Sequence, residues 1–322
     1  MSLALLLTLS SALSSPDVTE DFKVLSEGVT IVATLTRPAG EGPFPTMIVI
    51  GHGMGMTREG VGTERDGYRG LGFATVTYDR RGYGASGGSA DASFELSARD
   101  VRALVDHVTT LSCVDTAALG LSARSRGAWI APLVARDDAR IRFVVALVPP
   151  LRSVASIMVT ARLDQLAKAG RPREDLALAG RAMTAMCEVA RGRMDWASYL
   201  AVKKDVAAHS WAPALGLPGG EDDPLWPWLR ACVDYDPFPQ WRFVEQPVLG
   251  IFAGEDLDVE PGVNSAMLEA ACPDAHVEIL PGIGHDLLPV APHAGAAPRP
   301  DPAVWKCVGD WLSTRALLPQ RH

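Results

Sequence analysis

Hydrophobic residues along the chain follow two spacings, and the strand-like spacing comes first. Residues 29–36 alternate polar and β-branched side chains before a Pro/Gly turn, which predicts a strand of an antiparallel hairpin at a sheet edge. Residues 47–50 are all apolar and predict a buried strand that ends in a glycine-rich turn. Five later runs predict further strands: residues 73–78, 117–121, 143–148, 247–252 and 277–280.

Apolar positions three and four residues apart predict helices between these strands. Residues 94–108 place Leu96, Val101 and Leu104 on one helical face, and residues 127–135 and 304–312 are further helical segments. A crossover between parallel strands needs about a dozen residues, which a single helix supplies. The pattern therefore predicts an α/β fold with a mostly parallel central sheet flanked by helices.

The alternation of strands and helices stops after residue 152. Residues 153–245 have the pattern of amphipathic helices and Pro/Trp-rich loops, and we expect them to form a helical cap inserted into a core of residues 21–152 and 246–322. Five of the eight tryptophans lie in this segment: Trp196, Trp211, Trp226, Trp228 and Trp241. This concentration fits a small core of the cap itself, and it also fits an apolar ceiling over a substrate pocket.

Composition and charge exclude several classes of protein. The 322 residues are 48% hydrophobic and 21% charged, as in a globular protein rather than a disordered one. The formal net charge of −8 repels phosphates, so we expect no nucleic-acid partner. No apolar run reaches the length of about 18 residues that would span a bilayer as a helix, and no integral membrane segment is predicted.

The five cysteines are scattered along the chain without the spacing of a metal site. An odd number of cysteines cannot all pair within one chain. Neither a zinc site nor a disulfide scaffold is therefore expected.

The first 20 residues have the pattern of a signal peptide or an N-terminal extension. Residues 3–13 are largely apolar, a polar segment follows them, and Ser10 and Ala12 are small residues before a possible cleavage point. This pattern predicts a secreted or periplasmic protein. The segment lacks Lys and Arg, however, and a helix packed on the domain of a cytoplasmic protein is the alternative.

Ser125 stands at the junction of a predicted strand and a predicted helix. A nucleophile elbow holds its serine in a strained turn at such a junction, where only small residues fit two positions before and after the serine. Ala123 and Gly127 are both small, although alanine replaces the first glycine of the pattern G-x-S-x-G. Ser122 is the rival nucleophile, but Arg124 is too bulky for an elbow centred there.

A serine becomes a nucleophile at neutral pH when a base, itself oriented by a carboxylate, lies within hydrogen-bond reach. Asp256 follows the strand predicted at residues 247–252, and His285 follows the strand predicted at residues 277–280. Open parallel sheets bind ligands at the carboxyl ends of their strands, where both residues are expected to lie. Asp258 competes with Asp256 for this role, its other role being to cap the following helix.

Five motifs occur in a characteristic order. They are His52-Gly53-Met54-Gly55, the glycine-rich segment 78–86, the serine elbow, residues 254–261 and Gly284-His285. In this order and spacing the chain resembles α/β-hydrolase fold serine hydrolases, and more narrowly their esterase and peptidase-like branch with a helical cap. The resemblance extends from residue 22 to the end, weakly within the cap. It implies the α/β-hydrolase fold and an enzyme that needs no metal or organic cofactor.

The resemblance also assigns roles to individual residues. Ser125 attacks the carbonyl carbon, His285 transfers the proton, and Asp256 holds the imidazole in its tautomer. The backbone N–H groups of Met54 and Arg126 form the oxyanion hole. Because these donors are main-chain groups, unusual side chains at the two positions need not abolish the hole.

We expect a serine hydrolase that cleaves carboxylic esters of a small-molecule substrate through an acyl-enzyme. Peptide, amide and thioester cleavage are alternatives, because the same catalytic residues perform these reactions and the substrate pocket determines which substrate is cleaved. A catalytically silent binding protein of this fold is the alternative from another class, and it predicts Ser125 and His285 well beyond hydrogen-bond distance. Arg124 and Arg126, which flank the serine, are expected to pair with carboxylates of the protein, the alternative being an acidic group of the substrate.

Overall fold

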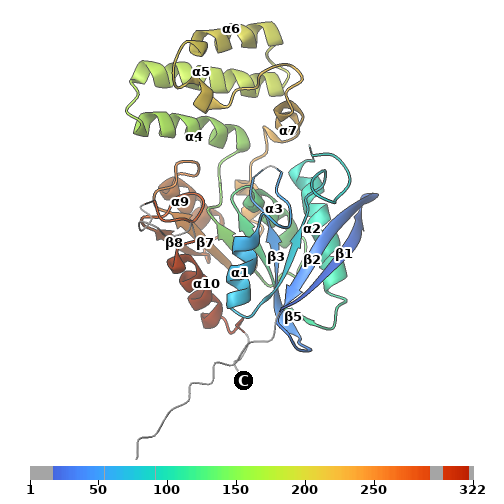
Figure 1. Cartoon of the computed structure of the whole chain (residues 1–322). Coiled ribbons are helices and arrows are strands. Elements are labelled where there is room, and N and C mark those ends of the chain that lie inside the picture. The colour runs from blue at the N-terminus through green and yellow to red at the C-terminus, as the bar shows by residue number, and fades with distance from the viewer. Residues whose placement is uncertain (1–16, 54, 91, 291–299, 319–322) are drawn as a thin grey trace, which may run out of the picture.

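A sheet of eight strands forms the centre of the molecule, in the order β1-β2-β4-β3-β5-β6-β7-β8 (Figure 1). The computed structural model describes residues 17–53, 55–90, 92–290 and 300–318. The strands are β1 (Val18–Ser26), β2 (Val29–Arg37), β3 (Phe44–Ile50), β4 (Ala74–Tyr78), β5 (Val114–Arg124), β6 (Phe143–Leu147), β7 (Val248–Ala253) and β8 (His276–Leu280). β2 pairs antiparallel with β1 and β4, and every other pairing is parallel. The mostly parallel sheet predicted from the sequence is confirmed.

Helices cover both faces of the sheet. They are α1 (Gly62–Gly70), α2 (Phe94–Val108), α3 (Gly127–Ala135), α9 (Pro261–Ala271) and α10 (Pro302–Thr314). Alternate residues of β3 face opposite sides: Ile48 and Ile50 pack in one core with α2, α3 and α9, while Met47 and Val49 pack in a second core with α1 and α10. Burial on both faces explains why residues 47–50 are apolar without interruption.

Helices also fill the chain between β6 and β7, a stretch that the structure describes throughout and in which no strand occurs. They are α4 (Val154–Lys168), α5 (Arg173–Ala190), α6 (Trp196–Ala207), the 3-10 helix η1 (Ala212–Leu215), α7 (Leu225–Cys232) and α8 (Phe238–Trp241). We call residues 153–245 the helical insertion. Figure 1 shows α4, α5 and α6 as a layer apart from the sheet. Ser153 and Asp195 begin α4 and α6 by accepting backbone N–H groups at the helix starts.

Two elements of the core were not predicted from the sequence. β1 is a charged edge strand whose residues are mostly exposed, and α1 contains three glycines and no apolar run. A side chain at Gly67 would overlap the indole of Trp305, so the glycine allows α1 to pack closely against α10. Because β1 begins at Val18, the core starts earlier than the boundary at residue 21 that the sequence suggested.

Several sequence-based expectations concern the ends of the chain and its cysteines. Residues 1–16, which carry most of the predicted signal peptide, lie outside the described residues. Among the helices of the described part, none is long and apolar enough to cross a membrane. All five cysteines are free thiols, including Cys187 and Cys232, which are both buried in the helical insertion.

Candidate active site

Ser125 occupies a tight turn between β5 and α3. Its φ angle is +49°, in the left-handed region that a residue with a side chain rarely adopts. The backbone N–H of Ser125 donates to the carbonyl of Leu147 in β6 at 2.9 Å, and its carbonyl accepts from the N–H of Ala128 at 2.8 Å. Such strain costs about 1–3 kcal/mol and persists only where surrounding bonds fix the backbone. The turn therefore has the geometry of a nucleophile elbow.

Small residues on either side allow the strand and the helix to meet at this turn. A side chain at Gly127 would overlap the carbonyl oxygen of Ile50 in β3. Ala123 is fully buried between β3 and β6, and its methyl group fits, so glycine is not required there. Ser122 lies inside the sheet with 1% of its surface exposed, and it is therefore not the nucleophile of an elbow.

His285, in the loop after β8, contacts both Ser125 and Asp256. Its Nε2 lies 3.0 Å from Oγ of Ser125, and its Nδ1 lies 2.8 Å from Oδ2 of Asp256. The second carboxylate oxygen of Asp256 accepts the backbone N–H groups of Asp258 and Val259 at 2.8 and 2.9 Å. The structure thus brings the three predicted residues into one hydrogen-bonded chain, in which backbone N–H groups also hold the carboxylate of Asp256.

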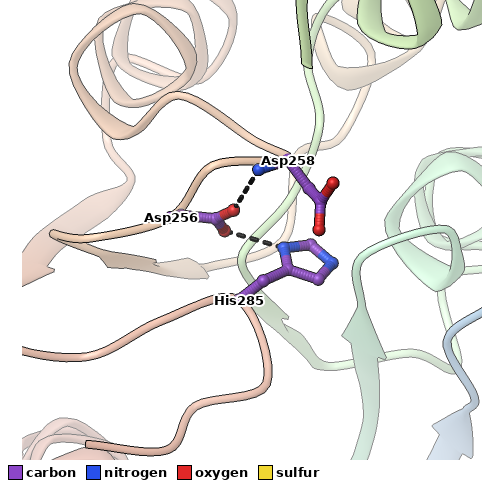
Figure 2. A group of neighbouring side chains, drawn as sticks. All are labelled: Asp256, Asp258 and His285. Carbon is purple, nitrogen blue, oxygen red and sulfur yellow. Dashed lines mark hydrogen bonds and ion pairs between the residues drawn. The ribbon is translucent and has the colours of Figure 1, made fainter. Parts of the chain in front are cut away.

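Asp258 lies close to the same imidazole but makes no hydrogen bond to it (Figure 2). Its Oδ1 accepts from Nε2 of Gln165 in α4 at 2.9 Å and lies 3.5 Å from Nη1 of Arg162. Capping of the next helix by Asp258 was a wrong expectation, because Glu260 supplies the carboxylate that caps α9. Asp256, Asp258 and His285 are near enough to resemble metal ligands, but both ring nitrogens of His285 are engaged by Asp256 and Ser125.

Two histidines near the site have pKa values shifted in opposite directions. Burial, the largest single effect, would lower the pKa of His285, but the hydrogen bond and charge of Asp256, with the charges of Asp258 and Asp286, outweigh burial and raise it. For His52, burial and then the charge of Arg124 act in the same direction and lower the pKa to about 3. His52 is therefore neutral at physiological pH, whereas His285 sits where a proton is stabilised.

The structure describes one of the two residues that are predicted to form the oxyanion hole. Arg126 follows Ser125 at the start of α3, which is where a backbone N–H donor is expected. Met54 lies outside the described residues, so its role stays a prediction. Before Met54 in the chain, the guanidinium of Arg80 donates to the carbonyls of Gly51 and, at 2.8 Å, Gly53. Arg80, which lies two residues after the end of β4, was not among the site residues predicted from the sequence.

Sequence comparison identifies the family. A family profile described as "Alpha/beta hydrolase family" matches residues 47–297. The chain belongs to the alpha/beta hydrolase family. The family resemblance drawn from its motifs is confirmed. No curated protein sequence matches this alpha/beta hydrolase.

Solved structures of other proteins share the fold of this alpha/beta hydrolase. The proline iminopeptidase of Mycobacterium smegmatis is 17% identical, with a TM-score of 0.61 over 92% of this chain and 99% of that chain. An esterase from Pyrococcus furiosus is 15% identical, with a TM-score of 0.59 over 92% and 91%. Est1E from Butyrivibrio proteoclasticus, with ferulic acid bound, is 16% identical, with a TM-score of 0.56 over 92% and 98%. Identities this low show the shared fold alone.

The two arginines that flank the serine of this alpha/beta hydrolase have different surroundings. Nε of Arg124 lies 3.0 Å from Oε1 of Glu64 in α1, an ion pair without the alignment of a hydrogen bond, and both side chains are buried. Arg126 is also buried, but its Nε and Nη1 have no hydrogen-bond partner within the described ranges. The expected protein carboxylate is therefore present for Arg124, and the described residues provide none for Arg126.

A cavity of about 380 Å³ lies beside Ser125, between the core and the helical insertion. Its walls on the insertion side are mostly apolar: Ile157, Met158, Met183, Leu215, Leu225 and Trp228. Ser125, Arg126 and His285 line it from the core. A larger cavity of about 530 Å³ between β8 and α10 contains none of these residues. Of the tryptophans in the insertion, Trp228 lines the cavity beside Ser125. Trp226 and Trp241 are fully buried, and Trp226 packs against Trp196 and Tyr199 within the insertion.

Proposed function

We propose that this alpha/beta hydrolase is a serine hydrolase that cleaves carboxylic esters of small molecules through an acyl-enzyme. One observation carries the proposal: Asp256, His285 and Ser125 form a continuous chain of contacts at 2.8 and 3.0 Å, and the serine faces a cavity. A silent protein of this fold is expected to hold Ser125 and His285 far apart, and the 3.0 Å contact argues against that alternative.

The chemistry follows from the three side chains. Oγ of Ser125 attacks the carbonyl carbon while its proton passes to Nε2 of His285, and Asp256 stabilises the imidazolium through Nδ1. The tetrahedral intermediate expels the alcohol, which takes the proton from His285 and leaves an acyl-serine. Water, deprotonated by His285, then attacks the acyl group. The bond between the acyl carbon and Oγ of Ser125 breaks, His285 returns the proton to Oγ, and the acid is released.

Backbone N–H groups would stabilise the charge that develops on the carbonyl oxygen. We assign this role to the N–H of Arg126, with that of Met54 as the second donor. Each donor of an oxyanion hole contributes about 10²- to 10³-fold in rate. Arg80 holds the backbone carbonyls of Gly51 and Gly53, which precede the proposed second donor in the chain.

The cavity lining favours esters over peptides. An enzyme that removes residues from a peptide amino terminus needs a free carboxylate in the pocket to bind the amine. The aspartate of the lining, Asp258, is already engaged by Gln165 and Arg162. Apolar walls supplied by the insertion suit the hydrocarbon part of an ester, and we propose that the helical insertion acts as the cap over the substrate.

Labelling with a fluorophosphonate probe tests the nucleophile. We expect stoichiometric labelling of the wild-type protein at Ser125, found by peptide mapping, and none in Ser125→Ala. Hydrolysis of p-nitrophenyl acyl esters, compared with that of amino-acid p-nitroanilides, then separates esterase from peptidase. An adduct at another serine, or a folded wild-type protein that does not react, would contradict the proposal.

A further inference from the structure

Arg126 is a buried cation in the cavity for which the described residues provide no counter-charge. Arg126 has 8% of its surface exposed and lines the cavity beside Ser125. Nearby buried arginines have partners: Arg124 pairs with Glu64, Arg81 with Asp100, and Arg80 donates to two backbone carbonyls. A buried charge without a partner is costly, and it persists where a ligand completes the site.

Aromatic rings flank the guanidinium of Arg126. Its Cζ lies 5.0 Å from the ring centre of Trp228 in α7 and 5.5 Å from that of Phe94 in α2. Contacts with ring faces stabilise the cation without using its N–H groups. Burial, followed by the charge of Arg80, lowers the pKa of Arg126 to about 9, so the side chain is still a cation at pH 7. The ring contacts therefore use none of the N–H groups in the guanidinium plane, and Nε and Nη1 are buried without a hydrogen-bond partner among the described residues.

The other charges of the cavity do not neutralise Arg126. Asp258 accepts a hydrogen bond from Gln165 and lies 3.5 Å from Arg162, which also lines the cavity. The charges of Asp258 and Arg162 balance each other, which leaves the positive charge of Arg126. A single carboxylate matches it in charge and matches a guanidinium in planar geometry. The remaining walls are apolar, so they suit a hydrocarbon chain rather than further anionic groups.

We propose that Arg126 binds a carboxylate of the substrate, so that the preferred substrates are esters that also carry one free carboxylate on an apolar body. This inference rests on the proposed function, because it names the substrate class of the same site. Arg126 follows Ser125 directly in the chain, and the scissile ester and the carboxylate therefore belong to one substrate molecule.

Matched ester pairs test the inference. The first series consists of the monomethyl and dimethyl esters of glutaric, adipic and suberic acids, which place the carboxylate on the acyl side. The second series consists of butyrate esters of ω-hydroxy acids and the methyl esters of those same compounds, which place the carboxylate on the alcohol side. We expect a higher kcat/KM for the monoanion than for its neutral partner in at least one series. In Arg126→Met this ratio falls about 10- to 100-fold, the range of one charged hydrogen-bonded contact, mainly through KM. Arg126→Lys, which keeps the charge but loses the planar fork, gives an intermediate ratio.

Two comparisons separate the possible failures. If wild-type protein neither reacts with a neutral fluorophosphonate nor hydrolyses any ester, the proposed function fails. If it reacts but prefers the neutral esters, or if Arg126→Met leaves the ratio unchanged while still reacting with the probe, only the present inference fails. A larger loss of the ratio in Arg162→Met than in Arg126→Met would move the anion site to Arg162 and overturn the assignment.

Inhibition of wild-type protein provides a measurement that needs no variant. We expect 4-phenylbutyrate to compete with a p-nitrophenyl ester at least 10-fold more tightly than 4-phenylbutyramide, since the two differ only in the charge that Arg126 would bind. Equal inhibition by the acid and the amide would contradict the inference even if the Arg126 variants fail to fold.

Discussion

Asp256 binds His285 with one carboxylate oxygen and the backbone of its own loop with the other. Oδ2 lies 2.8 Å from Nδ1 of the imidazole, and Oδ1 accepts two backbone N–H groups at 2.8 and 2.9 Å. A carboxylate held at both oxygens cannot rotate without losing hydrogen bonds. The loop after β7 therefore sets the orientation of His285, a residue that belongs to the loop after β8.

This relationship predicts a large effect of a small change at Asp256. Asp256→Asn keeps the size of the side chain, but its amide can donate to Nδ1 and favour the wrong imidazole tautomer. We expect kcat on a p-nitrophenyl ester to fall about 10⁴-fold, the effect of this change in other Ser-His-Asp enzymes. Circular dichroism and thermal unfolding check that the variant is folded. A loss below about 10-fold would mean that the carboxylate does not orient the base.

The raised pKa of His285 predicts the acid limb of the pH profile. His285 acts as a base only when neutral, so kcat/KM is lost as pH falls through the pKa of the free enzyme. That pKa lies above the usual 6.5, and the midpoint of the acid limb is expected above 6.5 as well. Asp258→Asn removes one of the negative charges that raise this pKa, and we expect the midpoint to move to lower pH.

Glu255→Gln provides the control for the pH profile. Glu255 is an exposed carboxylate of the same loop and lies 3.5 Å from Lys168, and it is not among the groups that shift His285. We expect its removal to leave the midpoint in place. An equal shift in both variants would point to the net charge of the loop, and an unmoved midpoint in Asp258→Asn would contradict the assignment of the limb to His285.

The sheet and the three site residues could be predicted because they depend on local pattern. Strands buried on both faces are rich in apolar residues, as at residues 47–50, and Ser125 and Asp256 follow the buried ends of β5 and β7. His285 follows the edge strand β8, which is only partly buried. The topology of parallel strands brings these ends together without any information from the rest of the chain. Ser122 could be set aside for a local reason as well, the size of Arg124.

Contacts between distant segments could not be predicted. α1 has too many glycines for a helical pattern, and Gly67 is explained only by Trp305 of α10. The surroundings of Arg126 come from Phe94 in α2 and Trp228 in α7, which the fold brings together around the cavity. Nothing in the local sequence separates Arg126 from Arg124. The signal peptide stays a prediction, as does the oxyanion role of Met54.

The close approach of β3 and α3 predicts that Gly127 tolerates no side chain. Gly127→Ala places a methyl group against the carbonyl oxygen of Ile50, and the backbone must move to relieve the overlap. We expect a loss of about 1–3 kcal/mol in the free energy of unfolding, measured by urea denaturation, together with slower reaction at Ser125. The matched control is Gly180→Ala in α5, where the added methyl group lies 3.7 Å from Leu163 and helix propensity favours alanine by about 1 kcal/mol. Equal stability changes in the two variants would contradict this account of the elbow.

The ion pair between Arg124 and Glu64 predicts strong coupling between β5 and α1. Both side chains are nearly inaccessible, with 7% and 1% of their surfaces exposed, and their closest atoms are 3.0 Å apart. Glu64→Leu leaves the arginine buried without its carboxylate, and we expect the free energy of unfolding to fall by about 3–5 kcal/mol.

The double variant Glu64→Leu, Arg124→Met distinguishes the pair from simple loss of packing. It removes both charges while keeping apolar volume in the site, so we expect it to be more stable than Glu64→Leu alone, because the uncompensated charge is gone. Chemical denaturation of the two single variants, the double variant and wild type gives the coupling energy directly. Additive losses would show that the two side chains do not interact energetically and would contradict this assignment of the ion pair.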